Sequence, residues 1–143
     1  MATGVEANIF LALYKRLQTL VFSPALLIAG PNVVFPPAGQ TKPKDYLEMT
    51  FLPNATRTRT LAGDGEQQHF GILQISVHCG SKTGIIDVMQ WADMIVGHFP
   101  LGLILYEGGK KVKITRKPYQ TVMPPEGGSI MVPVTISYES FNA

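Results

Sequence analysis

The chain has 143 residues, a length that favours one domain, residues 1–143, large enough to bury most of its apolar side chains. Apolar residues make up 45% and charged residues only 15%, below the usual quarter for soluble domains, and contacts between subunits commonly cover such a weakly charged surface. The net charge of +2 is too small to indicate nucleic-acid binding by itself, and the single cysteine excludes an intrachain disulfide, which fits a cytosolic origin.

The first predicted element is an amphipathic helix. Thr3 and Glu6 have the spacing of a capping box, which predicts a helix start at this point. Ser23 and Pro24 predict its end, because proline disfavours helical geometry in the preceding residue. The apolar stripe consists of Val5, Ile9, Leu13, Leu17 and Leu20, widened by Phe10, Tyr14, Val21 and Phe22. Much of this helix should therefore be covered by other parts of the protein.

The next segment contains two predicted strands and a long loop. Residues 25–28 are expected to form a short strand, and residues 46–52 a longer one that alternates apolar and polar side chains. Residues 54–68 are polar and predict a long exposed loop, in which Arg57 and Arg59 are the positive charges. Loops longer than about 12 residues are usually functional or disordered. We therefore expect either a solvated loop or one that docks on a partner.

The segment from His69 to Phe99 predicts a strand, a short turn and a second helix. On the strand, residues 69–79, the alternation places an apolar set on one face (Leu73, Ile75, Val77 and Cys79). The helix, residues 84–96 and ending near Phe99, has a buried side composed of Ile85, Val88, Ala92, Ile95 and Phe99. Trp91 and Met94 are expected to belong to the core, and Cys79 to be a buried, inert thiol.

The remaining chain predicts antiparallel strands. Residues 101–106 and 110–117 flank Glu107-Gly-Gly109, which is typical of a hairpin turn. Residues 130–138 predict a strand in which Pro133 requires an edge position or a bulge, because proline cannot donate to a ladder. The whole pattern predicts an α+β fold, a mostly antiparallel β-sheet packed with two α-helices in a single domain.

The strongest electrostatic feature is a basic cluster, Lys110, Lys111, Lys113, Arg116 and Lys117. Lysines of this kind commonly protect an edge strand against aggregation. The alternative is contact with phosphates or with an acidic partner, as in a small nucleic-acid-binding module that uses the strand from Lys110 to Lys117. The candidate protein-interaction residues are Arg57, Arg59, Lys110, Lys111 and Lys113.

No catalytic, cofactor-binding or metal-binding residues are predicted. His69, His78 and His98 have no carboxylates at metal-ligand spacing, and no nucleophile–base pattern occurs. No secretory signal is expected, and the most apolar window, residues 24–34, is too short to span a bilayer.

Several segments resemble the tail terminator, or tail completion, proteins of long-tailed bacteriophages. The resemblance lies in Gly71-Ile-Leu-Gln-Ile-Ser-Val77, the helix from Leu11 to Leu20, Tyr46-Leu47, Ala92-Asp93, His98-Phe-Pro-Leu-Gly102 and Val112-Lys-Ile-Thr-Arg-Lys-Pro118. Pro31-Asn-Val33 and Phe35 extend it.

The resemblance implies a structural virion protein of the phage tail, assembled in the host cytoplasm. It implies a homo-hexameric ring on the head-proximal end of the tail tube, which stops tube polymerisation. The expected partners are the tail tube protein and the head–tail connector protein. Genomic DNA would pass through the ring lumen without sequence-specific binding, and no membrane is involved.

Overall fold

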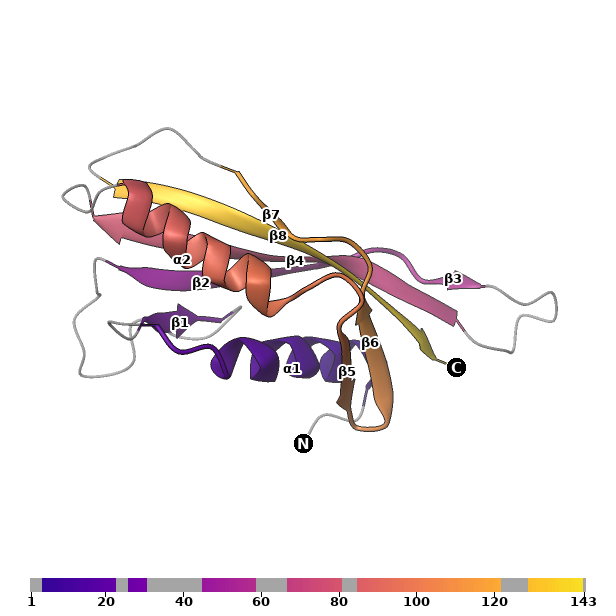
Figure 1. Cartoon of the computed structure of the whole chain (residues 1–143). Coiled ribbons are helices and arrows are strands. Elements are labelled where there is room, and N and C mark those ends of the chain that lie inside the picture. Colours follow the sequence, from indigo (N-terminus) through magenta and orange to yellow (C-terminus); the bar gives the residue numbers. More distant parts are fainter. Residues whose placement is uncertain are drawn as a thin grey trace.

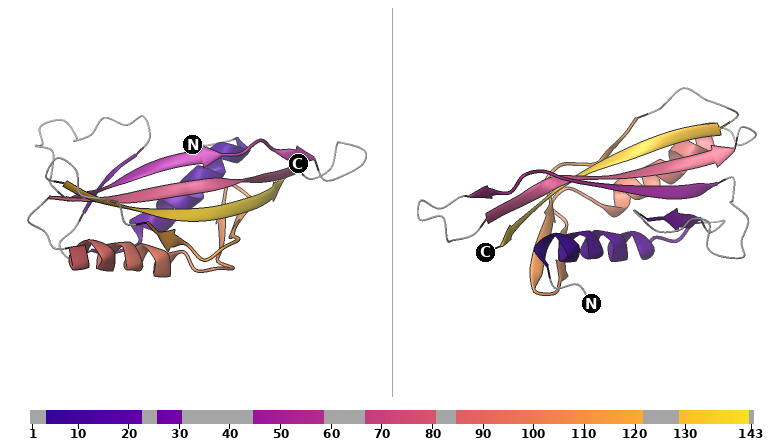
Figure 2. Two further views of the ribbon diagram at one scale, coloured as in Figure 1. Left: turned by 90° about the horizontal axis from the view of Figure 1, so that it is seen from above. Right: turned by 180° about the vertical axis from the view of Figure 1, so that it is seen from behind.

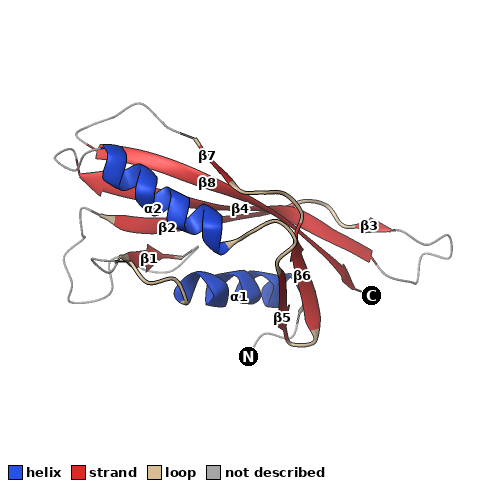
Figure 3. Cartoon of the chain, in the orientation of Figure 1, coloured by secondary structure: helices blue, strands red, loops and turns tan. Residues whose placement is uncertain are grey.

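The computed structural model describes residues 4–22, 26–30, 45–58, 67–80, 85–121 and 129–142, and it has the predicted α+β fold (Figures 1 and 3). The described elements are, in order, α1 (Val5–Gln18), β1 (Leu27–Ala29), β2 (Tyr46–Pro53), β3 (Arg57–Thr58), β4 (Gln67–Gly80), α2 (Ile85–His98), β5 (Ile104–Glu107), β6 (Lys110–Ile114), β7 (Tyr119–Gln120) and β8 (Ser129–Asn142). None of the helices in these ranges is long and apolar enough to cross a membrane.

The strands form one sheet around the long antiparallel pair of β4 and β8. The strand order is β1-β2-β4-β8-β6-β5, with β3 also paired to β4 and β7 also paired to β8. Only the β1–β2 pair is parallel. Strands β4 and β8 are 14 residues each and pair along their whole length, from Gln67↔Asn142 to Gly80↔Ser129. They set the long axis of the molecule (Figure 1).

Both helices pack against the same face of this sheet, and the core lies between them and the strands (Figure 2). The predicted alternation of β4 is confirmed, because Leu73, Ile75, Val77 and Cys79 are all buried. Cross-strand register aligns these residues with the apolar sides of β2 and β8. The helices contribute Ile9, Leu13 and Leu17 from α1 and Val88, Ala92 and Ile95 from α2. The opposite face of the sheet has no helix over it in the described residues.

The bounds of α1 differ from the prediction at both ends. Thr3 lies outside the described residues, and the N-cap is Gly4 with no side-chain cap, so the predicted capping box is wrong. Glu6 instead lies 3.1 Å from the ring of His69. The helix ends at Gln18, well before Pro24, because Thr19 closes the last turn onto the carbonyl of Arg16.

Several residues of the predicted apolar helix faces are exposed. Val21 follows the end of α1 and is 81% exposed, so its place in the apolar stripe was wrong. The same correction applies to Ile85, which begins α2 at its outer side, and to Met94, which points away from the sheet. Trp91 is partly buried against the core, as expected.

The segment predicted as a loop from 54 to 68 is in part a strand pair. Arg57 and Thr58 pair with Gln68 and Gln67, which continues the β2–β4 ladder. Residues 54–56 face only residues 69 and 70 across this ladder, so one extra residue forms a β-bulge between β2 and β3. The remainder, residues 59–66, lies outside the described residues.

The C-terminal strands confirm the hairpin and correct two edge predictions. The turn between β5 and β6 has Gly108 at φ 57° and Gly109 at φ 78°, which L side chains rarely adopt. Strand β6 lies between β5 and β8, so it is not the sheet edge. Strand β8 lies between β4 and β6, so it is not a sheet edge either. The carbonyl oxygen of Pro133 accepts from the Thr121 amide, just beyond the end of β7 at Gln120. The nitrogen of Pro133 points to the same side, where β7 has ended, so the N–H that proline lacks is not needed for a ladder there.

Candidate interaction site

Three of the candidate residues share one face at one end of the sheet. The pairing of the strands forms two neighbouring rows of side chains across the sheet. In the first row Arg57 lies opposite Gln68, which lies opposite Phe141. In the second row Phe70 lies opposite Glu139, which lies opposite Lys113. Lys111 lies two residues before Lys113 on the same face of β6. We call Arg57, Phe70, Lys111, Lys113 and Phe141, together with Glu139, the basic–aromatic face. It spans β3, β4, β8 and β6, roughly 14 Å at the usual strand spacing.

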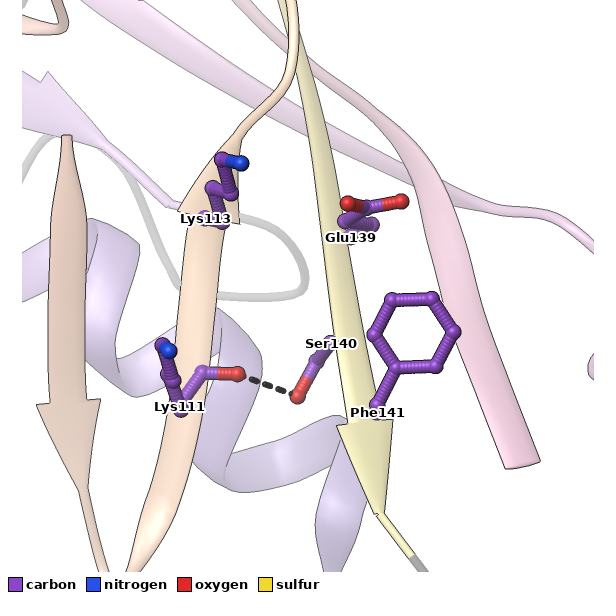
Figure 4. Close-up of a pocket in the computed structure, with 5 residues that line it drawn as sticks. All are labelled: Lys111, Lys113, Glu139, Ser140 and Phe141. Carbon is purple, nitrogen blue, oxygen red and sulfur yellow. Dashed lines mark hydrogen bonds between the residues drawn. The ribbon is translucent and has the colours of Figure 1, made fainter. Parts of the chain in front are cut away.

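A pocket opens within this face, between β6 and the end of β8 (Figure 4). Its volume is about 370 Å³, and its lining consists of Lys111, Lys113, Glu139, Ser140 and Phe141. It forms because β6 and β8 pair only at Lys113↔Glu139 and Ile114↔Tyr138 and then separate. One hydrogen bond, from the Ser140 hydroxyl to the carbonyl oxygen of Lys111, links the two strands across the pocket (Figure 4).

The pocket has a net positive charge, because Lys111 and Lys113 line it together with the single carboxylate of Glu139. Lys111 and Lys113 form no ion pair among the described residues, although Lys113 lies opposite Glu139 in the ladder. The Glu139 carboxylate instead accepts a hydrogen bond from Gln68 Nε2 at 3.1 Å. Arg57 lies over the ring of Phe70, with its guanidinium carbon 4.6 Å from the ring centroid. This arrangement suits an occupant that carries a carboxylate or phosphate beside an apolar group.

The other candidate basic residues lie elsewhere or are not described. Lys110 is half-buried at the turn of the β5–β6 hairpin. Arg116 is outside the strand and lies over the Tyr119 ring at 5.1 Å, while Lys117 is exposed in the same connection. Arg59 lies outside the described residues. The structure therefore groups Lys111 and Lys113 with Arg57 rather than with Arg116 and Lys117.

A second surface, at the opposite end of the sheet, is the outer surface of α2. Its first turn exposes Ile85 and Ile86, which are 42% and 68% exposed, and its later turns expose Met94. Asp87 is exposed beside the two isoleucines. This combination of exposed apolar side chains and one carboxylate is typical of a surface that contacts another protein.

The three histidines each contact polar groups from other parts of the chain. His69 contacts Glu6 at 3.1 Å, and His78 contacts Glu48 at 3.3 Å and stacks on Tyr46. His98 lies 2.7 Å from the Thr19 hydroxyl, and burial lowers its pKa below the usual 6.5. No group of three His, Cys, Asp or Glu residues in the described ranges could hold a metal ion.

Cys79 is buried on the core face of β4, as the alternation predicted. Burial, with the negative charges of Asp45 and Asp87, raises the pKa of its thiol to about 12. A thiol in this state is a poor nucleophile, because the thiolate is the reactive form.

The sequence did not indicate the aromatic and acidic members of the basic–aromatic face. Phe141 and Glu139 were missed because the last strand was predicted to end at Tyr138, and it continues to Asn142. The alternation gave no signal for this extension, because the apolar series Val134, Ile136 and Tyr138 is followed by Ser140, while the apolar Phe141 falls on the other face.

Comparison with known proteins finds a matching family and similar solved structures. The family model described as phage tail terminator protein matches residues 8–138. A solved structure named only by a sequence identifier superposes with a TM-score of 0.76 at 28% sequence identity, over 94% of this chain and 94% of that chain. No curated protein sequence shows significant similarity to this chain.

Proposed function

Because this chain belongs to the phage tail terminator family, we propose that it forms a six-membered ring on the head-proximal end of the tail tube. Membership makes the chain a structural component of the virion tail. In the proposal, the ring ends polymerisation of the tube and presents the surface on which the head–tail connector binds. The tail tube protein and the connector are its partners, and genomic DNA passes through the lumen.

The match to the family model over residues 8–138 carries this proposal. Surface features support it. Strands β1 and β5 end the strand order, and their outer edges pair with no other strand of the described residues, so neighbouring subunits can extend them. Exposed apolar side chains occur on several elements, among them Leu52 at 50%, Ile86 at 68% and Tyr106 at 70%. In a weakly charged chain, such side chains are well suited to contacts between subunits.

The proposal treats residues 1–143 as one tail-terminator-like domain that assembles with tails in the host cytoplasm. Its test is removal of the chain during tail assembly. Tubes assembled without it should be longer than normal and fail to join heads, and the purified protein added back should restore both length and joining. Tubes of normal length without the chain would overturn the capping role.

A second candidate function is nucleic-acid binding by the strand from Lys110 to Lys117. The observation that favours it is the grouping of Lys111 and Lys113 with Arg57 and Phe141 on one face. Binding of this type should weaken steeply as the salt concentration rises. Titration of a duplex DNA probe at two salt concentrations separates this function from that of a ring with no affinity for DNA.

A further inference from the structure

We infer that the basic–aromatic face of one subunit receives the first turn of α2 from a neighbouring copy of this chain, with Asp87 of that copy set against Lys111 and Lys113. The inference rests on the proposed function, because it assigns the residues that join neighbouring subunits of the ring. The partner is a second copy of this chain, and the contact runs head to tail.

Charge complementarity is the first argument. Asp87 is the one carboxylate of the described residues that neither forms an ion pair nor accepts a hydrogen bond. The others have partners: Glu6 with His69, Glu48 with His78, Asp45 with the Gly80 amide, Asp93 with Gln120, Glu107 with Lys15, and Glu139 with Gln68. Lys111 and Lys113 are the lysines that line a pocket without an ion pair. The unpaired carboxylate of α2 is therefore complementary in charge to the two unpaired lysines of the basic–aromatic face.

The apolar groups are matched as well. Ile85 and Ile86 directly precede Asp87 and are exposed, so docking of this turn removes two isoleucines from water together with the carboxylate. Phe141 lines the pocket and is 41% exposed. An isoleucine seated against this ring would place the adjacent carboxylate near the lysines. An anion without an apolar neighbour would leave Phe141 and the isoleucines exposed.

The position of the two surfaces fits a ring. Residues 67–70 and 139–142 are at one end of the β4–β8 ladder, whereas α2 starts five residues after Gly80, at the other end. Figure 1 shows the C-terminus and α2 at opposite ends of the long strands. A strand of 14 residues spans roughly 46 Å. Different surfaces at opposite ends form head-to-tail contacts, which close into a ring when the rotation between subunits permits.

A two-fold contact between copies is disfavoured by the same charges. It would set each basic–aromatic face against its own copy, with Lys111 and Lys113 facing lysines of the same sign. The head-to-tail contact instead sets Asp87 against lysines of the opposite charge.

Charge reversal tests the contact, since all three side chains are exposed and their replacement should not affect folding. The variants are Asp87→Lys and the double variant Lys111→Glu with Lys113→Glu. Each alone should raise the concentration at which rings form by more than about tenfold, measured by sedimentation velocity and electron microscopy. An equal mixture of the two variants should recover rings, because alternating subunits make every contact complementary again.

Lys117→Glu is the matched control, because it changes the same charge on an exposed lysine outside the pocket. It should form rings as the wild type does, and equal melting temperatures for all variants should show intact folding. Recovery by mixing supports this contact, since a general effect of net charge would not require the complementary variant.

The remaining outcomes separate the inference from the proposed function. If both reversal variants form rings as readily as the wild type, the inference is overturned and the proposed function still stands. Absence of wild-type rings, both in solution and on purified tail tubes, would overturn the proposed function and the inference with it. Loss of binding to a duplex DNA probe in the double lysine variant, with its rings intact, would show that this face contacts nucleic acid instead.

Discussion

Arg16 and His98 exchange hydrogen bonds between the last turns of the two helices. Arg16 Nε donates to the carbonyl oxygen of His98 at 3.0 Å, and His98 Nε2 lies 2.8 Å from the carbonyl oxygen of Arg16. Both acceptors are carbonyls in the last turn of a helix, and the Arg16 carbonyl also accepts from Thr19. The pair therefore satisfies two helix ends at once and ties α1 to α2, although 82 residues separate them in the chain.

This contact predicts a pH dependence of stability. Burial lowers the pKa of His98 below the usual 6.5. Above pH 6.5 the imidazole is neutral in both the folded and the unfolded protein, and the protein has its full free energy of unfolding. As the pH falls through 6.5, the unfolded chain takes up the proton first, so the free energy of unfolding decreases until the folded pKa is reached. His98→Gln removes this dependence, and chemical denaturation between about pH 7.5 and 5 should give a shallower decline than in the wild type. An equal decline of the free energy of unfolding with pH in the variant and the wild type would contradict this role of His98.

Gly71 is required by close packing rather than by backbone conformation. A Cβ there would lie 2.6 Å from the Leu52 carbonyl oxygen and 2.8 Å from the Tyr138 hydroxyl. Gly71→Ala should therefore lower the free energy of unfolding by about 1–3 kcal/mol. Gly97, in α2, has open space around its Cβ position, so Gly97→Ala is the control and should raise it by about 0.5–1 kcal/mol. Urea denaturation measures the free energy of unfolding of both variants. Equal changes in the two variants would contradict the close packing at Gly71.

Cys79 should be inert in the folded protein. Its side chain is 1% exposed, and burial raises the pKa of the thiol to about 12. A colorimetric thiol reagent at pH 8 should react with less than a tenth of the chain in an hour, and with all of it in denaturant. Rapid reaction of the native protein would show that the core around β4 opens readily.

Arg57 and Arg59 should contribute to docking on the tail. Arg57 is exposed on the basic–aromatic face, and arginine binds carboxylates through its planar fork. Reversal of both residues to glutamate should leave the melting temperature nearly unchanged but weaken capping, seen as longer tubes or tails without heads. Normal tail length and head joining in this variant would eliminate the docking role.

Local patterns in the sequence predicted most of the fold. Alternation from Leu73 to Cys79 identified the buried face of β4, and Gly108 with Gly109 identified the turn of the β5–β6 hairpin. Both are local properties, set by the period of a strand and by positive φ angles. The end of α1 was missed because Thr19 closes the last turn onto the carbonyl of Arg16, where the distant His98 also binds, and neither contact is part of the hydrophobic pattern.

The candidate site depends on contacts that no local pattern contains. Lys111 and Lys113 are two residues apart on one strand and so share a face, but Arg57 joins them only through the pairing of β3 with β4, β4 with β8 and β8 with β6. Register between segments distant in the chain is set by the core as a whole. Asp87 was likewise overlooked, because its lack of a partner is visible only once the partners of the other carboxylates are known.

The most direct test of the ring is cryo-electron microscopy of assembled tails at the head-proximal end of the tube. We expect six copies of this chain around the tail axis, each joined to the next through different surfaces, directly above the last ring of tube protein. A single copy, or copies in an arrangement without cyclic symmetry, would contradict the proposed role.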